Sequence, residues 1–297
     1  MKNQFSYLIG VLVLEISILS FTAYGKIEVA NSQNVCVRFE HVAFNVADPV
    51  TMANWYVKNL GMKIMRQDGA PTYTTFIADS GEHMMIELFH NADYPLFPAQ
   101  KINVMSLHLA FCSPDIKKTV EQLLSNGASL ADSLKPTASG DLVCILRDPW
   151  GLPIQFVQRA TPMLRHSGLY IEHFALNLSD SRKTASWYEQ NTEMKRIRDG
   201  KAPTYGMFVS DSTQAMMFEL YQNEEYPVID FGTISPMSIH VAFQVTSVEQ
   251  AKQLLVSQGA VVADDITTTL IGDQVLMMRD INGFPIQFVH RAKPMIK

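Results

Sequence analysis

The sequence predicts an α+β protein built from four βαβββ units, arranged as two copies of one domain. A length of 297 residues suits two domains of ordinary size. Polar motifs recur at a constant spacing of 132 positions, and within each copy the hydrophobic pattern changes between the strand and helix periods. The repeated polar pairs are His41 and His173, Glu87 and Glu219, His108 and His240, and Gln155 and Gln287.

The residues around these pairs repeat as well. The segment Glu40–Asn45 returns as Glu172–Asn177, and Pro153–Val157 returns as Pro285–Val289. Because the motifs return in the same order, we expect a duplicated domain with a boundary at about residue 165. The connection between the copies is short and carries Pro162, so we expect the two domains to pack closely.

The first unit of each copy begins with a strand and a helix. Apolar and polar residues alternate over Phe39–Val46, which indicates a strand. Asp48 and Pro49 are typical of a helix start, and Gly61 is typical of a helix end. Three short strands are then expected at Met62–Arg66, Tyr73–Ala78 and Met84–His90.

The second unit repeats this order. A strand is expected at Met105–Cys112 and an amphipathic helix at Asp115–Asn126, with Gly127 after its end. The last strands are predicted at Leu142–Leu146 and Ile154–Val157, and the remaining strand must lie within Ala128–Ser139.

Charge and cysteine content exclude some classes of function. The net charge is −5 and there is no run of Lys or Arg, so the chain has no electrostatic basis for binding nucleic acid. Cys36, Cys112 and Cys144 are an odd number and have no cysteine at the repeat positions, so we expect small buried side chains in place of disulfides.

The first 25 residues differ from the rest of the chain. Lys2 precedes an apolar stretch over Tyr7–Phe21, and Ala23 and Gly25 provide the small residues of a cleavage site before Lys26. Residues 1–25 are therefore predicted to be a secretory signal peptide, which implies a periplasmic or secreted protein. Glu15 lies inside the apolar stretch, and an uncleaved membrane anchor is the alternative.

Three segments resemble a known family. They are Trp55–Met62, Glu87–Asn91 and Arg147–Gln155. The chain resembles the vicinal oxygen chelate superfamily, which includes glyoxalases, bleomycin-resistance proteins and dioxygenases. The resemblance implies glyoxalase-like domains over residues 36–163 and 168–295, in which paired βαβββ units form an eight-stranded open cup around a divalent metal.

The resemblance also implies the metal ligands. The family's four metal positions fall on His41, Glu87, His108 and Gln155 in the first copy, and on His173, Glu219, His240 and Gln287 in the second. A carboxylate within an apolar strand requires a cation or several hydrogen bonds, and imidazole, carboxylate and amide donors suit an ion of intermediate softness. We expect one divalent metal per domain: Zn, Ni, Co, Mn or Fe. Hydrogen-bonded core histidines are the alternative.

Two further points concern how the cups are built and what acts as a base. Each cup could close within one copy, or His41 and Glu87 could instead meet His240 and Gln287. Glyoxalase I has a glutamate at the last-strand position that acts as ligand and base, whereas this chain has glutamine, which cannot take a proton near neutral pH. Proton transfer would therefore fall to Glu87 or Glu219.

Four asparagines are candidates for contacts with a ligand. Asn91 and Asn223 follow the glutamates by four residues, at a position that contacts glutathione in glyoxalase I. Asn45 and Asn177 share a strand face with His41 and His173, respectively.

Wall residues differ between the copies, as in the replacement of Trp150 by Asn282, so the two cups are expected to be unequal.

These observations favour an exported metal-dependent protein with lyase or isomerase chemistry on a small oxygen-chelating substrate. The second hypothesis is a non-catalytic protein that sequesters a small molecule, like the bleomycin-resistance branch. The third is an iron dioxygenase whose triad would be His41, His108 and Glu87. Assembly into a homodimer stays open.

Overall fold

The computed structural model describes residues 34–296. Their strands form two eight-stranded mixed sheets, and their helices are few, so the predicted α+β class is confirmed. The predicted signal peptide, residues 1–25, lies outside the described residues. Over residues 34–296 no helix is long and apolar enough to cross a membrane.

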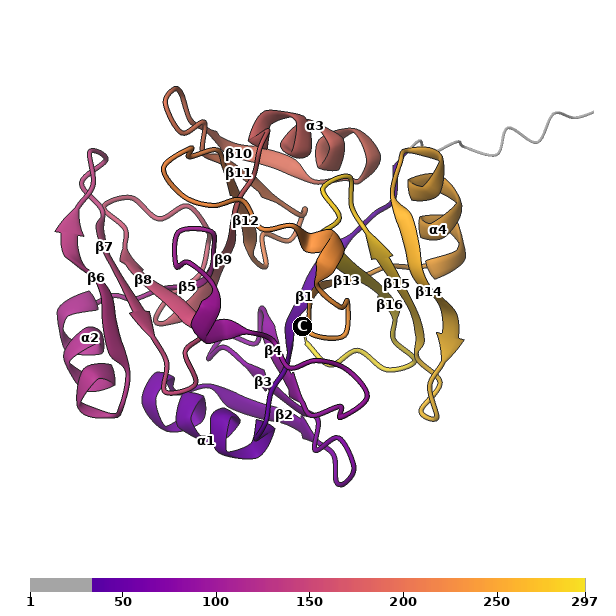
Figure 1. The fold of residues 1–297 in the computed structure, drawn as a ribbon, viewed down its shortest axis with the longest axis horizontal. Coiled ribbons are helices and arrows are strands. Elements are labelled where there is room, and N and C mark those ends of the chain that lie inside the picture. Colours follow the sequence, from indigo (N-terminus) through magenta and orange to yellow (C-terminus); the bar gives the residue numbers. More distant parts are fainter. Residues whose placement is uncertain (1–33, 297) are drawn as a thin grey trace, which may run out of the picture. The chain divides into compact units, whose positions relative to one another are not determined.

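The four predicted units are present in the described residues (Figure 1). The first contains β1 (Arg38–Asn45), α1 (Pro49–Leu60), β2 (Lys63–Gln67), β3 (Thr75–Ala78) and β4 (Met85–Phe89). After the 3₁₀ helix η1 (Ala99–Lys101), the second contains β5 (Leu107–Cys112), α2 (Ile116–Ser125), β6 (Ser129–Pro136), β7 (Leu142–Arg147) and β8 (Pro153–Gln158).

The second copy repeats both units. Its first unit contains β9 (Tyr170–Asn177), α3 (Ser181–Asn191), β10 (Lys195–Asp199), β11 (Met207–Ser210) and β12 (Met217–Tyr221). After the 3₁₀ helix η2 (Phe231–Thr233), the last unit contains β13 (Ile239–Gln244), α4 (Val248–Ser257), β14 (Val261–Thr268), β15 (Gln274–Arg279) and β16 (Pro285–His290).

The sheets do not follow the boundary between the copies. One sheet has the order β14-β15-β16-β13-β1-β4-β3-β2, and the other has the order β10-β11-β12-β9-β5-β8-β7-β6. In each sheet the two units meet at an antiparallel pair, β1 with β13 and β5 with β9. We call the first sheet cup 1 and the second cup 2. Each cup therefore takes one unit from each copy, which is the alternative that the sequence left open.

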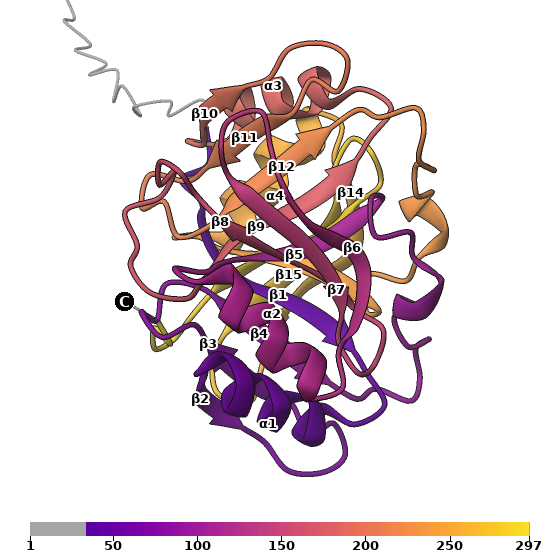
Figure 2. The ribbon, with the colours of Figure 1, turned by 90° about the vertical axis from the view of Figure 1, so that its left-hand side faces the viewer.

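Helix α1 shows how local sequence positions these units. The Asp48 side chain accepts a hydrogen bond from the Thr51 backbone at 3.0 Å, and Pro49 follows at the first helical position. Gly61 closes the helix with a φ of 67°, a left-handed conformation that glycine adopts at little cost. The predicted start and end of this helix are confirmed. The four α-helices of the described residues, α1 to α4, lie on the outer side of their sheets (Figures 1 and 2).

The two units of one copy contact each other through the helix layer. In the first copy, the Trp55 indole donates to the Asn126 carbonyl at 2.8 Å, and the Tyr56 hydroxyl lies 2.9 Å from the buried Asp148 carboxyl. The two sheets also contact each other, since the Phe39 ring of cup 1 lies 5.0 Å from the Phe218 ring of cup 2. One hydrophobic core therefore joins all four units, and the expected close packing of the domains is observed.

The cysteines only partly follow the prediction. All three are free thiols; Cys112 and Cys144 are buried, as expected. Cys36 is exposed between the buried Val35 and Val37, and here the prediction was wrong.

Candidate metal centres

The eight predicted ligands gather into two sites, one in each cup. The site in cup 1 contains His41 of β1, Glu87 of β4 and His240 of β13, with Gln287 of β16 lining the same cavity. The site in cup 2 contains His108 of β5, His173 of β9 and Glu219 of β12, with Gln155 of β8 lining the same cavity.

Of the two groupings that the sequence left open, the structure has the one that crosses the copies. His108 and Gln155 do not join His41 and Glu87, because β1 pairs with β13 and β5 pairs with β9. The predicted triad of His41, His108 and Glu87 does not form for the same reason. His240 occupies the place that this prediction gave to His108.

The carboxylate of each site lies between two imidazoles. In cup 1, Oε2 of Glu87 is 3.0 Å from Nε2 of His41 and 3.8 Å from Nε2 of His240. In cup 2, Oε2 of Glu219 is 3.0 Å from Nε2 of His173 and 3.9 Å from Nε2 of His108. The two triads thus have nearly the same geometry, which indicates that the duplication preserved it.

The four histidines are oriented alike, with Nε2 toward the carboxylate of their site. In each of the four, Nδ1 has a hydrogen-bond partner, while the buried Nε2 faces the glutamate of its site, at 3.0 Å in His41 and His173 and at 3.8 and 3.9 Å in His240 and His108. Nδ1 of His108 lies 2.9 Å from the Val104 carbonyl, and Nδ1 of His240 lies 3.0 Å from the Pro236 carbonyl. A carbonyl can only accept, so these Nδ1 atoms carry the proton and each Nε2 presents a lone pair.

These donor atoms fit a divalent cation. In each triad the candidate ligand atoms lie within 4.8 Å of one another. One cation could bind the two imidazole nitrogens and the carboxylate of each triad together. Burial lowers the pKa of both His108 and His240 to about 4, which keeps these imidazoles neutral near pH 7.

The other histidine of each site is held by two carboxylates. Burial lowers the pKa of His41, but its bonds to Glu40 and Glu87 outweigh burial and raise it. Burial raises the pKa of Glu87, and the neighbouring imidazoles outweigh this and hold it below the ordinary value. His173 and Glu219 are shifted in the same directions. Each site therefore favours an ionised glutamate next to a positively charged group.

A second layer of charged residues orients His41 in cup 1. We did not predict this layer from the sequence. Glu40 lies 2.7 Å from Nδ1 of His41 and receives two bonds from Arg291, each 2.7 Å long. Arg291 also bonds Asp273 at 2.7 Å. Although burial raises the pKa of Glu40, the bonds from Arg291 and His41 lower it to about 2. Such outer partners fix the ring orientation of a ligating histidine.

A bulge places Glu40 beside His41. The register between β1 and β13 shifts between Phe39 and His41, so Glu40 is the extra residue and both side chains reach the same network. Cup 2 repeats this with Glu172, Arg159 and Asp141. The signal was present in the sequence, since the Glu-His dipeptide, the arginine and the aspartate all recur at the repeat spacing of 132 residues.

The cavities beside the two triads differ. The cavity of cup 1 measures about 520 Å³ and that of cup 2 about 160 Å³. Leu270 and Ile271 border the first, whereas Met105, Tyr221 and Asn223 border the second. Access to the two triads is therefore unequal, as expected, but Trp150, which was predicted to be a wall residue of a cup, lines neither of these cavities.

The structure shows what two of the four predicted asparagines bind within the chain. The Asn45 amide donates to the carbonyls of Asn91 (3.0 Å) and Tyr94 (3.1 Å) and accepts from the Asn91 backbone at 2.8 Å. Asn177 makes the matching bonds, including 3.0 Å to the Asn223 carbonyl. Both amides thus bind the chain after β4 and β12. Contact with a ligand stays a prediction for all four asparagines.

Comparisons with known proteins identify the family. The sequence profile of the Glyoxalase/Bleomycin resistance protein/Dioxygenase superfamily matches residues 38–156 and 170–288. The chain belongs to this superfamily. Proteins of this superfamily bind small-molecule substrates and typically hold a divalent metal, which agrees with the two triads.

Individual members of the superfamily show the same likeness. The chain is 24% identical over 128 residues to the lactoylglutathione lyases of Escherichia coli O157:H7 and Shigella flexneri, a match that covers 41% of this chain and 93% of each lyase. Glyoxalase I from Zea mays has a TM-score of 0.67 and 19% identity, covering 86% of this chain and 92% of the maize chain. A Bacillus subtilis protein provisionally described as a dioxygenase has a TM-score of 0.62 and 13% identity, with coverages of 88% and 87%. These structural likenesses concern the fold.

Proposed function

We propose that the protein is an exported, metal-dependent enzyme that performs lyase or isomerase chemistry on a small substrate with two adjacent oxygens. Each cup would hold one divalent cation from the Zn, Ni, Co, Mn or Fe group. The observation that carries this proposal is that in each cup two buried Nε2 atoms converge on one carboxylate oxygen.

The chain's own residues would divide the work as follows. A bound divalent ion would supply Lewis acidity toward the two substrate oxygens. Glu87 and Glu219 are the candidate bases: their pKa values are held low, and their side chains retain 16% and 22% exposure at the cavities. Each would accept a proton from the substrate carbon next to the polarised oxygen and return it to the adjacent atom of the same substrate. Glu40 and Arg291 would keep His41 in position.

Export is part of the proposal and rests on the N-terminal pattern alone. The apolar stretch and the small residues before Lys26 have the form of a secretory signal. An oxidising compartment would suit a substrate other than a glutathione adduct. Mass spectrometry of the protein from its native host tests this, and a mature chain that still begins at Met1 would favour the membrane-anchor alternative.

One observation favours sequestration as a second candidate. The fourth polar residue of each cup is Gln155 or Gln287, an amide that cannot exchange protons. A cup with one carboxylate could hold a metal and a small molecule without turning it over. An iron dioxygenase remains the third candidate, with two histidines and one glutamate per cup.

Elemental analysis of protein purified without chelator tests the metal, and solvent exchange tests the chemistry. We expect one ion per cup and incorporation of deuterium from D₂O into α-hydroxycarbonyl compounds, followed by NMR. The Glu87→Gln, Glu219→Gln double variant should lose exchange, whereas exchange should be unchanged by Glu121→Gln, which alters an exposed glutamate on α2. Metal binding with no exchange across the panel would leave sequestration. Oxygen uptake with a catechol would instead indicate the dioxygenase.

A further inference from the structure

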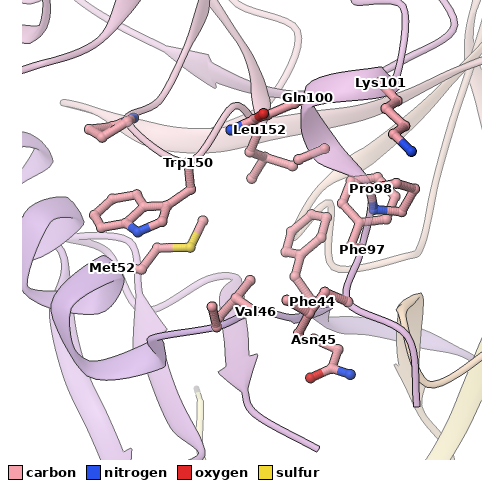
Figure 3. A pocket seen from close by; sticks show the side chains of 14 residues that line it. Phe44, Asn45, Val46, Met52, Phe97, Pro98, Gln100, Lys101, Trp150 and Leu152 are labelled. Carbon is pink, nitrogen blue, oxygen red and sulfur yellow. The ribbon is translucent and has the colours of Figure 1, made fainter. Parts of the chain in front are cut away.

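The first copy contains a cavity outside both cups. It measures about 380 Å³ and lies between the end of β1, helix α1, the segment 96–101 and the turn 149–152. Figure 3 shows Trp150 and Met52 on one side of it and Phe44 and Phe97 on the other. Its volume falls within the range of sites that bind small molecules.

The lining of this cavity is apolar with a single charge. Phe44, Met52, Trp150 and Leu152 line the cavity with aromatic, sulfur-containing and aliphatic side chains. Trp150 is half-buried and the other three are buried. Lys101 is the one charged side chain among its 14 lining residues. Flat rings pack well against indole and phenyl groups and against methionine sulfur. An anionic group could pair with Lys101 at the exposed rim.

The walls are fixed by the surrounding structure. The Arg147 guanidinium donates to the carbonyls of Ala99 at 3.0 Å, Gly151 at 2.8 Å and Ile102 at 2.7 Å. These bonds tie the segment 96–101 to the turn 149–152, so two sides of the cavity are held together. A cavity with fixed walls loses less free energy in ordering itself around a ligand.

The second copy keeps this clamp but not the lining. Arg279 makes the equivalent bonds, including 2.9 Å to the Gly283 carbonyl. Met52 and Trp150 are replaced there by Thr184 and Asn282, whose side chains bond each other at 2.9 Å. Lys101 is replaced by Thr233. The scaffold is thus duplicated, and the apolar lining and its cation belong to the first copy.

We propose that this cavity, which we call the Trp150 pocket, binds a small aromatic anion, with one or two fused rings between Trp150 and Phe44 and the acid group at Lys101. The pocket lies apart from both metal triads, so the inference goes beyond the proposed function and does not depend on it. Each chain would bind one such molecule.

Calorimetry with 2-naphthoate tests the proposal on the full chain. We expect one molecule bound per chain, with affinity unchanged when a chelator removes metal. Replacing the lining by that of the second copy, Met52→Thr with Trp150→Asn, should weaken binding about tenfold or more. Lys101→Ala should weaken 2-naphthoate binding and leave binding of the neutral 2-naphthalenemethanol unchanged.

A second pair of variants guards against effects on folding. Ala47→Phe adds a ring at an exposed position that lines the pocket, and it should also reduce affinity about tenfold or more. Ser179→Phe is the matched control, because Ser179 is exposed at the equivalent position of the second copy. The proposal is overturned if 2-naphthoate shows no saturable binding at millimolar concentration. It is equally overturned if binding needs metal, if it survives both pocket changes, or if Ser179→Phe abolishes it to the same extent.

Discussion

Cup 1 and cup 2 have the same triad but different walls. The carboxylate-to-imidazole distances agree to about 0.1 Å, at 3.0 and 3.8 Å in cup 1 and 3.0 and 3.9 Å in cup 2. Their cavities nevertheless measure about 520 and 160 Å³. The duplication has therefore kept the inner chemistry constant while the approach to it changed.

Specific side chains account for part of this difference. At the end of β12, the Tyr221 hydroxyl donates to the Met105 carbonyl and joins the two halves of cup 2. Cup 1 has Phe89 at this position, which has no hydroxyl to donate. On the hairpin after β14, Leu270 and Ile271 border the cavity of cup 1, and cup 2 has Ala138 and Ser139 there. A few wall residues thus give different cavities to two triads of nearly the same geometry.

The largest predicted effect concerns the number of metal ions that the two triads bind. We expect two metal ions per chain, one from each triad, and Glu87→Gln should reduce this to one. Adding His240→Ala should leave the content at one ion, because both residues serve cup 1. Adding His108→Ala instead should empty both cups. Elemental analysis measures this, with Glu121→Gln as the control. Loss of both ions in the Glu87→Gln, His240→Ala variant would contradict the pairing of units across the copies.

The second prediction concerns the charged residues behind the first histidine. Glu40→Gln should weaken metal binding in cup 1 by about 10- to 100-fold and leave cup 2 unchanged, because a partner that orients a ligating imidazole is lost. Glu172→Gln should do the reverse. Competition with a chromophoric chelator resolves the two affinities. Equal weakening of both cups by one substitution would show that the two networks are not independent.

The third prediction tests whether the hydrogen bond from Tyr221 makes the cavity of cup 2 smaller. Tyr221→Phe should open cup 2 by removing the bond to Met105 and increase its affinity for a metal-binding hydroxamate by up to about tenfold, the equivalent of one hydrogen bond. Titration of the cobalt-loaded protein, followed by its visible absorption, measures this. Phe89→Tyr is the reciprocal change in cup 1. An unchanged affinity in both variants would rule out this bond as the cause of the smaller cavity.

The smallest predicted effect lies at the rim. Exchanging Leu270 and Ile271 for alanine and serine should weaken binding of octanohydroxamate to cup 1 by about three- to tenfold, because less apolar surface is buried. Binding of acetohydroxamate should stay the same, since it is too short to reach the rim. The same titration measures both. Equal losses for the short and the long ligand would mean that the rim acts on the metal site itself.

Much of the fold could be predicted from the sequence because its signals are local or periodic. Asp48, Pro49 and Gly61 determine the ends of α1 through capping and backbone conformation. Strand alternation predicted the strand that carries His41, and the resemblance to the superfamily placed His41 and Glu87 at a common site, where the structure has them. The same alternation could not place Glu40, because a bulge shifts the register by one residue there. It also left unseen that the amides of Asn45 and Asn177 bind the following segments.

The sequence by itself determined the four units, their duplication and the eight candidate ligands, since residue identity and period are written along the chain. Only the tertiary structure decided that His41 and Glu87 meet His240 instead of His108. The physical reason is that alternation specifies which face of a strand is buried but not which strand edge will pair with it. In a duplicated chain, two edges with nearly the same pattern compete, and the packing of all four units around one core selects between them.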